Sequence, residues 1–260
     1  MAQMKTPGVY IIEKNAFPNS VVEVATAIPA FIGHTQFARD GNKDLTGIPF
    51  RISSMAELHS FFGFAPTLRF GIRPEDSESE DTTNDINVLF PDGSCQLTLP
   101  KTFYALYYNM LLFYANGGGP CYIVSVGDYE HDFKSIDFTN ALLALKKEQE
   151  PTLVVVPEAV YMEEGDCYKV QTAALMHCGN DMKNRFAILD VFNGYKDENG
   201  AVIKSFRENI GSNFLAYCAS YYPWINTSIV TEKDITFYNI EKDSLEKLEE
   251  LILNEFSKKS

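Results

Sequence analysis

Short apolar strands alternate with helical segments through much of this chain, and this alternation limits the possible folds more than any other feature. Each strand candidate is a short run of apolar residues without the polar alternation of a half-exposed strand. Strands that alternate with helices indicate a parallel sheet covered by helices on both faces. The sequence therefore predicts a doubly wound, mostly parallel α/β sheet. Strands are expected at 30–33, 121–126, 152–157 and 185–191, and helices at 101–117, 139–150, 169–178 and 205–222.

One short helix has clear boundaries in the sequence. Ser54 and Glu57 have the spacing of a capping box, in which the two residues satisfy each other's backbone N–H groups. Gly63 stands where a helix would stop, because glycine readily adopts the left-handed conformation at a helix end. This pattern predicts a helix from Met55 to Phe62.

Four later helices are predicted with other features. The helix that ends at Gly117 has no polar face, so it should be buried on most of its sides. Thr139 is expected to cap the next helix, and Pro223 to end the helix over 205–222. The segment 243–256 has apolar residues at helical spacing, which predicts a helix with one packed face and one face in water.

These patterns divide the chain into three regions: an extended β arm over residues 1–28, an α/β domain over 29–236 and a terminal amphipathic helix over 237–260. The α/β domain contains an acidic loop near 74–86, where EDSESEDTTND has no apolar side chain to bury. A calcium loop is the alternative for this stretch. It lacks the ligand spacing and the glycine of an EF-hand, which favours a surface loop.

Composition limits the possible partners and the cellular location. The formal net charge of −13 argues against a nucleic-acid surface, which needs clustered Lys and Arg. No apolar run is long enough to span a bilayer, and the first residues lack the pattern of a secretory signal. A protein made in the cytoplasm, without membrane insertion, is therefore expected. The five cysteines include no C-x-x-C pair and are interpreted as reduced thiols.

Candidate catalytic residues stand after the predicted strands, where ligands bind in open α/β sheets. Asp128, Glu158 and Asp190 could act as acid and base or hold a metal, although loop and helix-cap roles are the more usual interpretation. The sequence NGGGP at 116–120 closes a helix and opens a strand, which is the reverse of a phosphate loop.

A hydrolase is the main enzymatic alternative. His177 and Asp190 could form a triad with Ser212 or Ser220, but both serines fall in a helical pattern and no G-x-S-x-G motif exists. His177 and Cys178 are adjacent and would point apart on a helix, so a metal site is not expected there. No catalytic, cofactor or metal site is predicted.

The first residues contain two β-rich segments that no tight turn connects. The loose sequence AFPN separates them, so they need not pair with each other. Strand-forming residues are enriched in both segments. The sequence by itself therefore leaves the pairing partners of these segments open, and the resemblance described next implies that they pair with another chain. The residues concerned are Val9, Tyr10, Ile11 and Ile12 in the first segment and Val21, Val22 and Val24 in the second.

Several stretches, in order, resemble the contractile tail sheath proteins of phages, R-type pyocins and extracellular contractile injection systems. They are PGVYIIE, VATAIPAFIGHT, SSMAELHSFFG, NGGGPCYIVSV, VQTAALMHC with RFAILDV, and YYPW, between residues 7 and 225. The resemblance implies a subtilisin-like α/β layer that is not known for protease activity. It also implies subunits that stack as hexameric rings around an inner tube protein, meet baseplate and cap proteins, and add their terminal arms as strands to neighbouring sheets.

Members of the sheath family usually continue well beyond the YYPW stretch into a further carboxyl-terminal domain. The chain is therefore expected to be part of a longer subunit, or otherwise a shortened homologue in which 237–260 begins that region. The resemblance predicts a structural, non-enzymatic protein of a phage tail or tail-like particle that contracts and drives its tube through a target envelope. A sheath-related cap or baseplate component is an alternative with the same fold.

Overall fold

A six-stranded sheet forms the centre of the fold in the computed structural model, which describes residues 27–74, 88–89, 95–98, 102–196 and 200–258. The strand order is β11-β10-β9-β1-β8-β4. All neighbouring strands are parallel except β4, which is antiparallel to β8. The predicted α/β fold with a mostly parallel sheet is therefore confirmed. The strands are β1 (Pro29–Gly33), β4 (Phe50–Ile52), β8 (Cys121–Ser125), β9 (Leu153–Val155), β10 (Phe186–Asp190) and β11 (Cys218–Tyr221).

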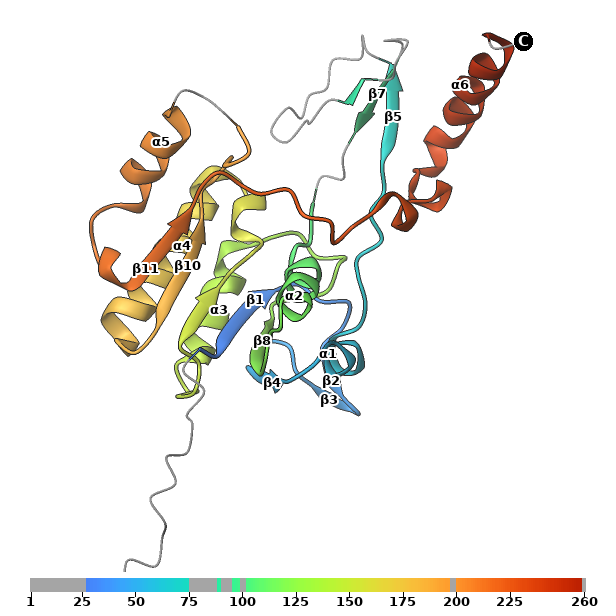
Figure 1. The fold of residues 1–260 in the computed structure, drawn as a ribbon. Coiled ribbons are helices and arrows are strands. Elements are labelled where there is room, and N and C mark those ends of the chain that lie inside the picture. The colour runs from blue at the N-terminus through green and yellow to red at the C-terminus, as the bar shows by residue number, and fades with distance from the viewer. Residues whose placement is uncertain (1–26, 75–87, 90–94, 99–101, 197–199, 259–260) are drawn as a thin grey trace, which may run out of the picture.

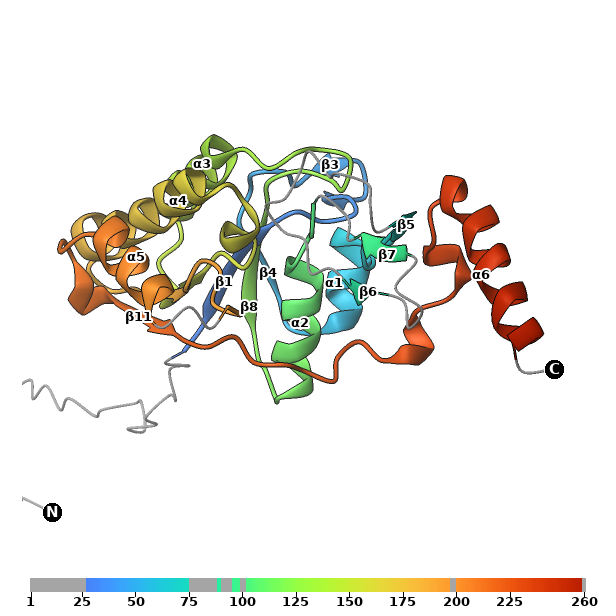
Figure 2. The same cartoon turned by 90° about the horizontal axis from the view of Figure 1, so that it is seen from above.

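Three helices cover one face of this sheet (Figures 1 and 2): α3 (Ser135–Leu145), α4 (Glu164–Met176) and α5 (Ala201–Ile210). Alternate strand residues point to this face, as the two-residue period of a strand requires. Ile32 and Val124 pack there against fully buried Phe138. This layer holds the largest apolar core of the molecule.

The opposite face is covered only in part, by α1 (Met55–Phe62) and α2 (Leu106–Ala115). Phe31 and Ile123 point to this side and pack with Phe62 and Met110. No described helix covers the same face of β10 and β11, and Ile188 stays half-buried there. The sheet is therefore closed on one face and half open on the other.

The predicted helix from Met55 to Phe62 is confirmed, with Ser54 and Gly63 at its ends, although the return bond of the expected capping box goes to Ser53 and not to Ser54. The Ser54 hydroxyl accepts a hydrogen bond from the Glu57 backbone N–H at 3.2 Å, and the Glu57 carboxylate accepts one from the Ser53 N–H at 2.6 Å. Gly63 has φ of 85°, a conformation that favours glycine. The local sequence and the tertiary structure agree here.

The helix α2 is shorter and less buried than its sequence predicts. It begins at Leu106, and of its ten residues only Leu106 and Met110 are buried. The helix packs on the sheet and on α1, and seven further residues are half-buried, with Ala115 exposed. The expectation of burial on most sides therefore holds only in part, and the side of α2 that faces away from the sheet stays half-exposed.

The single helix expected over 205–222 is also wrong. The helix α5 ends at Ile210, where Gly211 adopts φ of 75°, and the chain then forms strand β11 beside β10. Four paired residues in a parallel ladder outweigh the modest helical propensity of this segment. The sequence pattern did not predict this fifth parallel strand, because its residues, CASY, include no β-branched residue.

Thr139 does not cap a helix, since α3 begins four residues earlier at Ser135. The Thr139 hydroxyl instead donates to the Ser135 backbone carbonyl at 2.6 Å. Threonine makes this bond to the preceding turn when it lies inside a helix. The prediction failed because a hydroxyl residue suits both positions.

A small second unit lies beside the main sheet. It contains a three-stranded sheet of β5 (Gly71–Pro74), β6 (Val88–Leu89) and β7 (Cys95–Thr98), and the carboxyl-terminal helix α6 (Leu245–Lys258). Ile72, Cys95 and Leu251 form its core. The remaining short elements are β2 (Arg39–Asp40), β3 (Lys43–Asp44), a π-helical turn at His177–Met182, and 3-10 turns at Ala159–Tyr161, Leu215–Tyr217, Glu232–Asp234, Phe237–Asn239 and Lys242–Ser244.

Two predicted segments lie largely outside the described residues: the β arm up to residue 26, with all of its candidate pairing residues, and most of the acidic loop near 74–86. Across the described ranges, every helix is too short or too polar to cross a lipid bilayer.

A matched pair of substitutions tests the one-sided packing of α2. Met110→Ala should lower the free energy of unfolding by about 2 to 5 kcal/mol, because it leaves a cavity in a closed core. Leu111→Ala, on the half-exposed side, should cost less than about 1.5 kcal/mol. Urea denaturation of both variants gives the comparison. Equal losses would mean that α2 is covered on both sides.

Candidate functional site

Three carboxylates follow parallel strands at the same end of the sheet, as the sequence predicts. Asp128 follows β8, Glu158 follows β9, and Asp190 is the last residue of β10. Their surroundings differ, so they do not form one catalytic group. No cluster of three or more His, Cys, Asp or Glu residues able to hold a metal ion occurs among the described residues.

Glu158 is fully buried and connects three elements. Its Oε2 accepts hydrogen bonds from the backbone N–H of His34 at 2.9 Å and lies 2.8 Å from His34 Nδ1. Its Oε1 accepts from the N–H of Leu106 at 3.3 Å, at the first turn of α2. Burial raises the pKa of Glu158, while the bonds from His34 oppose this shift. Glu158 thus joins the ends of β1 and β9 to the start of α2.

The Glu158 and His34 pair resembles part of a catalytic triad but lacks the remaining features. Both side chains are at most 1% exposed, so a substrate cannot reach them without rearrangement. Among the described residues, no Ser, Thr or Cys side chain is hydrogen-bonded to His34. Aromatic rings of Tyr104, Phe133 and Phe138 pack around the imidazole instead. The pair therefore joins elements of the fold and does not form a catalytic site. It was not predicted from the sequence.

Asp128 belongs to its own loop. Its carboxylate accepts a hydrogen bond from the Glu130 N–H at 2.9 Å and lies 2.5 Å from His131 Nδ1. These contacts lower the pKa of Asp128, with the backbone bond contributing most. Such a short-range pattern is typical of a turn in which an Asp side chain bonds the backbone two residues on.

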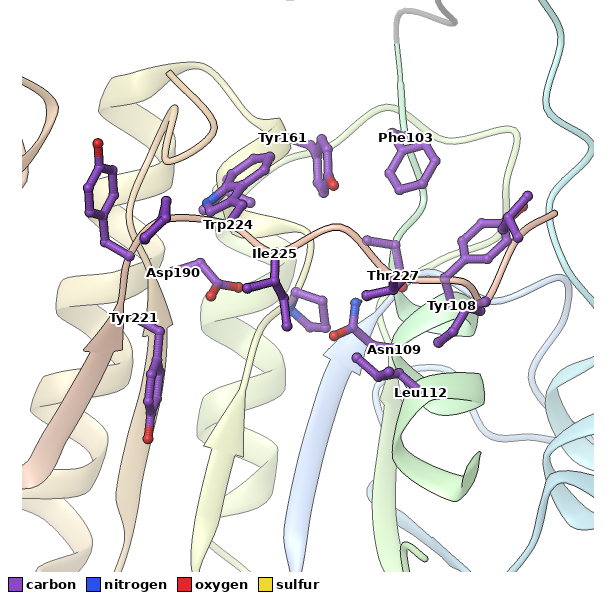
Figure 3. Close-up of a pocket in the computed structure, with 17 residues that line it drawn as sticks. Phe103, Tyr108, Asn109, Leu112, Tyr161, Asp190, Tyr221, Trp224, Ile225 and Thr227 are labelled. Carbon is purple, nitrogen blue, oxygen red and sulfur yellow. Dashed lines mark hydrogen bonds between the residues drawn. The ribbon is translucent and has the colours of Figure 1, made fainter. Parts of the chain in front are cut away.

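Asp190 lines a pocket of about 660 Å³ at the carboxyl ends of β9, β10 and β11 (Figure 3). The chain after β11 crosses above these strand ends and forms one wall, with Trp224 and Ile225 pointing into the pocket. The uncovered side of α2 contributes Tyr108 and Leu112. Because α2 covers only half of its sheet face, this space stays open beside it.

A row of aromatic rings crosses the pocket. Ring centroids are 5.5 Å apart for Tyr108 and Phe103, 4.9 Å for Phe103 and Tyr161, and 5.8 Å for Tyr161 and Trp224. The Trp224 indole N–H donates to the Val191 carbonyl at 2.9 Å, which fixes the orientation of the ring. This row was not predicted from the sequence. The high aromatic content was the available signal, but the rings come from three separate parts of the chain, at 103–108, 161 and 224.

Asp190 is the charged residue of this pocket. Its side chain is exposed to the pocket, yet the surrounding protein raises the pKa of its carboxyl by burial. The same carboxylate is the second cause, after burial, that raises the pKa of Tyr161 to about 12. Its backbone carbonyl accepts a hydrogen bond from the Gln171 side chain at 2.7 Å, which holds the end of β10.

His177 and Asp190 do not meet, although the sequence allowed it. The helix α4 runs antiparallel to β10, so its carboxyl end lies where β10 begins. Gln171 contacts the end of β10, and His177 lies six residues farther along the helical segment, about 9 Å at 1.5 Å per residue. Ser212 lies in the exposed turn after α5 and Ser220 on β11. The proposed triad is not assembled.

The contacts of His177 stabilise the fold. Its Nε2 lies 2.9 Å from Arg185 Nη1, so the neutral ring accepts a hydrogen bond from the guanidinium. Arg185 also donates to the backbone carbonyls of Leu145 and Glu148 at the end of α3. Burial lowers the pKa of His177 to about 4, and the charge of Arg185 adds to the shift. This group of contacts closes the end of α3 against α4.

The sequence NGGGP forms a helix stop and a tight turn, as predicted. Asn116 follows the last residue of α2, and Gly117 has φ of 82°. The N–H of Gly118 donates to the Phe113 carbonyl at 2.9 Å, so it bonds its own helix. The turn connects α2 directly to β8.

Comparison with known proteins adds no family assignment: no protein-family model matches the chain, and no curated protein gives a significant match. The fold and the contacts above are therefore the basis of the functional argument, together with the resemblance in the sequence.

Removing one oxygen of Glu158 tests its connecting role. Glu158→Gln replaces one acceptor oxygen with an NH₂ group, so at least one of the facing donors loses its partner. We expect a loss of about 1 to 3 kcal/mol in the free energy of unfolding. Glu163→Gln, at an exposed position, is the control and should change little. Similar small effects for both variants in urea denaturation would contradict the connecting role.

The buried His177 predicts a dependence of stability on pH. Its folded pKa is about 4 and its ordinary value is 6.5, so the unfolded chain binds a proton more readily. The contribution of His177 to stability is complete above 6.5 and decreases as pH falls towards 4. Over this window the wild type should lose up to about 3 kcal/mol more than His177→Gln. Parallel urea curves for both proteins across the window would refute this assignment.

Proposed function

We propose that the chain is a structural subunit of a contractile tail sheath. In this proposal it polymerises as stacked hexameric rings around an inner tube, between a baseplate and a cap, in a phage tail or tail-like particle. It is made in the bacterial cytoplasm, needs no cofactor and catalyses no reaction. Contraction of the rings drives the tube through a target envelope.

The observation that carries the proposal is the number of exposed apolar side chains in the part of the chain that follows the sheet, residues 221–253. Tyr221, Ile225, Phe237, Tyr238 and Leu253 are between 61% and 78% exposed. Large exposed apolar side chains are tolerated singly, but a concentration of them indicates a surface that another molecule covers. A subunit buried among copies of itself would need such a surface.

The sheet edge supports the same proposal. The strand β11 pairs only with β10, so its other edge is open in the described chain, as Figure 1 shows. Open edges promote unwanted association in monomeric proteins and are usually protected. In a polymer an open edge is a connection point. The proposed pairing strands are Val9 to Ile12 and Val21 to Val24 of a neighbouring subunit.

The segments that resemble sheath proteins also fall on separate elements of the sheet layer. The FIGHT stretch covers most of β1, SSMAELHSFFG forms α1, CYIVSV forms β8, and RFAILDV forms β10. This order is compatible with the subtilisin-like layer that the resemblance implies. The hydrolase alternative is weaker, because His177 and Asp190 lie apart. A cap or baseplate role shares the fold and differs in the position of the chain in the particle.

Truncation of the arm tests the proposed assembly. Removal of residues 1–20 should leave a folded subunit that no longer forms tubes, because the first pairing strand is lost. Removal of residues 1–6 is the matched control, since these residues precede the β-rich segment, and tubes should persist. Negative-stain electron microscopy distinguishes the two. Tubes that form without residues 1–20 would disprove the arm assignment, and a wild type that forms no rings or tubes would disprove the sheath proposal.

A further inference from the structure

The pocket beside α2 contains an acidic group without a matching charge. The Asp190 carboxylate has no side-chain hydrogen bond or ion pair among the described residues, and no Lys, Arg or His lines the pocket in that part of the chain. Asn109 adds an amide oxygen, a second acceptor, while its amide nitrogen donates to the Ala105 carbonyl at 3.0 Å. The polar groups of the pocket therefore suit a ligand that donates hydrogen bonds and carries positive charge.

The walls of the pocket favour the same ligand chemistry. Figure 3 shows Trp224, Tyr161 and Phe103 on one side of the space that Asp190 enters. Aromatic faces attract ammonium and guanidinium groups through the negative charge of the ring face. An arginine or lysine side chain also has an alkyl stem that can pack on Leu112 and Ile225. A carboxylate below aromatic rings is a suitable site for such a side chain.

The rim of the pocket indicates a polypeptide rather than a free small cation. Tyr221, Ile225 and Val230 line the pocket and also extend into solvent as exposed apolar side chains. A small cation would leave this rim uncovered, whereas a docked protein surface would cover the rim and the pocket together. Central charged anchors surrounded by apolar contacts are typical of protein interfaces.

The geometry points to a docking site in which Asp190 and the surrounding rings receive a lysine or arginine side chain of a second copy of this chain. The inference rests on the proposed function, which supplies the second copy. It goes beyond that function because it assigns an inter-subunit contact to described residues of the α/β layer, separate from the β arm.

Charge removal in the assembled protein tests the site. Asp190→Asn should raise the concentration needed for half-maximal assembly at least about tenfold, because the incoming charge loses its partner. Asp190→Glu should restore much of the loss. Asp128→Asn, at another strand end but bonded within its own loop, should assemble like the wild type. Sedimentation velocity measures assembly, and thermal unfolding confirms that each variant folds. Assembly of Asp190→Asn at the wild-type concentration would overturn the inference.

A free probe tests the ligand chemistry independently. Trp224 is the single tryptophan of the chain, so its fluorescence reports on the pocket. N-ethylguanidinium should change this fluorescence saturably and inhibit assembly, and the effect should be lost in Asp190→Asn. The neutral analogue N-ethylurea is the control. Equal responses to both compounds, or equal responses in both proteins, would overturn the inference.

The two experiments also separate the inference from the proposed function. A wild type that assembles into tubes with no dependence on Asp190 would keep the sheath proposal and refute the docking site. A wild type that stays monomeric but binds N-ethylguanidinium through Asp190 would refute the sheath proposal. It would also refute the second copy as occupant and leave only a cation-binding pocket.

Discussion

A fully buried carboxylate determines how the centre of this fold is held together. Glu158 receives hydrogen bonds from His34 and Leu106, and these join the ends of two central strands to the start of α2. Gly33 fits this arrangement because a Cβ there would lie 2.9 Å from Leu106 Cβ and 3.1 Å from Glu158 Cδ. Burying a carboxyl group costs free energy unless its acceptors are satisfied, so the position and direction of α2 follow from these bonds.

The position of α2 in turn shapes the surface. The helix covers β1 and β8 and leaves the same face of β10 and β11 without a helix. The chain after β11 crosses this open region, and the aromatic pocket lies between the crossing segment and the uncovered side of α2. Exposed Tyr221 and Ile225 lie at the β11 end of the sheet, whereas exposed Phe237, Tyr238 and Leu253 belong to the segment next to and within α6, on the other side of the molecule in Figure 1. Partial coverage of one sheet face thus accounts for the pocket and for the exposed side chains beside β11.

Much of the fold could be predicted from local patterns. Runs such as CYIVS identify buried strands because few other structures accommodate them, and the caps of α1 are encoded by Ser54, Glu57 and Gly63. The strand β11 was not predicted, because CASY becomes a strand through its hydrogen bonds with β10 and not through its own residue types. The contacts of His34 could not be predicted, since its partner is 124 residues away. The aromatic pocket could not be predicted for the same reason, because its rings come together only in the tertiary structure.

The small unit around α6 has a consequence for synthesis of the chain. Its strands β5 and β7 lie in the first 98 residues, but their core is completed by Leu251, and the Ile72 N–H bonds the Ser244 hydroxyl 172 residues later. Closing such a long loop is entropically costly and slow. Until residues 244–251 have been synthesised, Ile72 and Leu97 therefore lack their apolar partner. During that interval the emerging chain has to keep this strand pair from binding other chains, and the many carboxylates between the two strands suit that need.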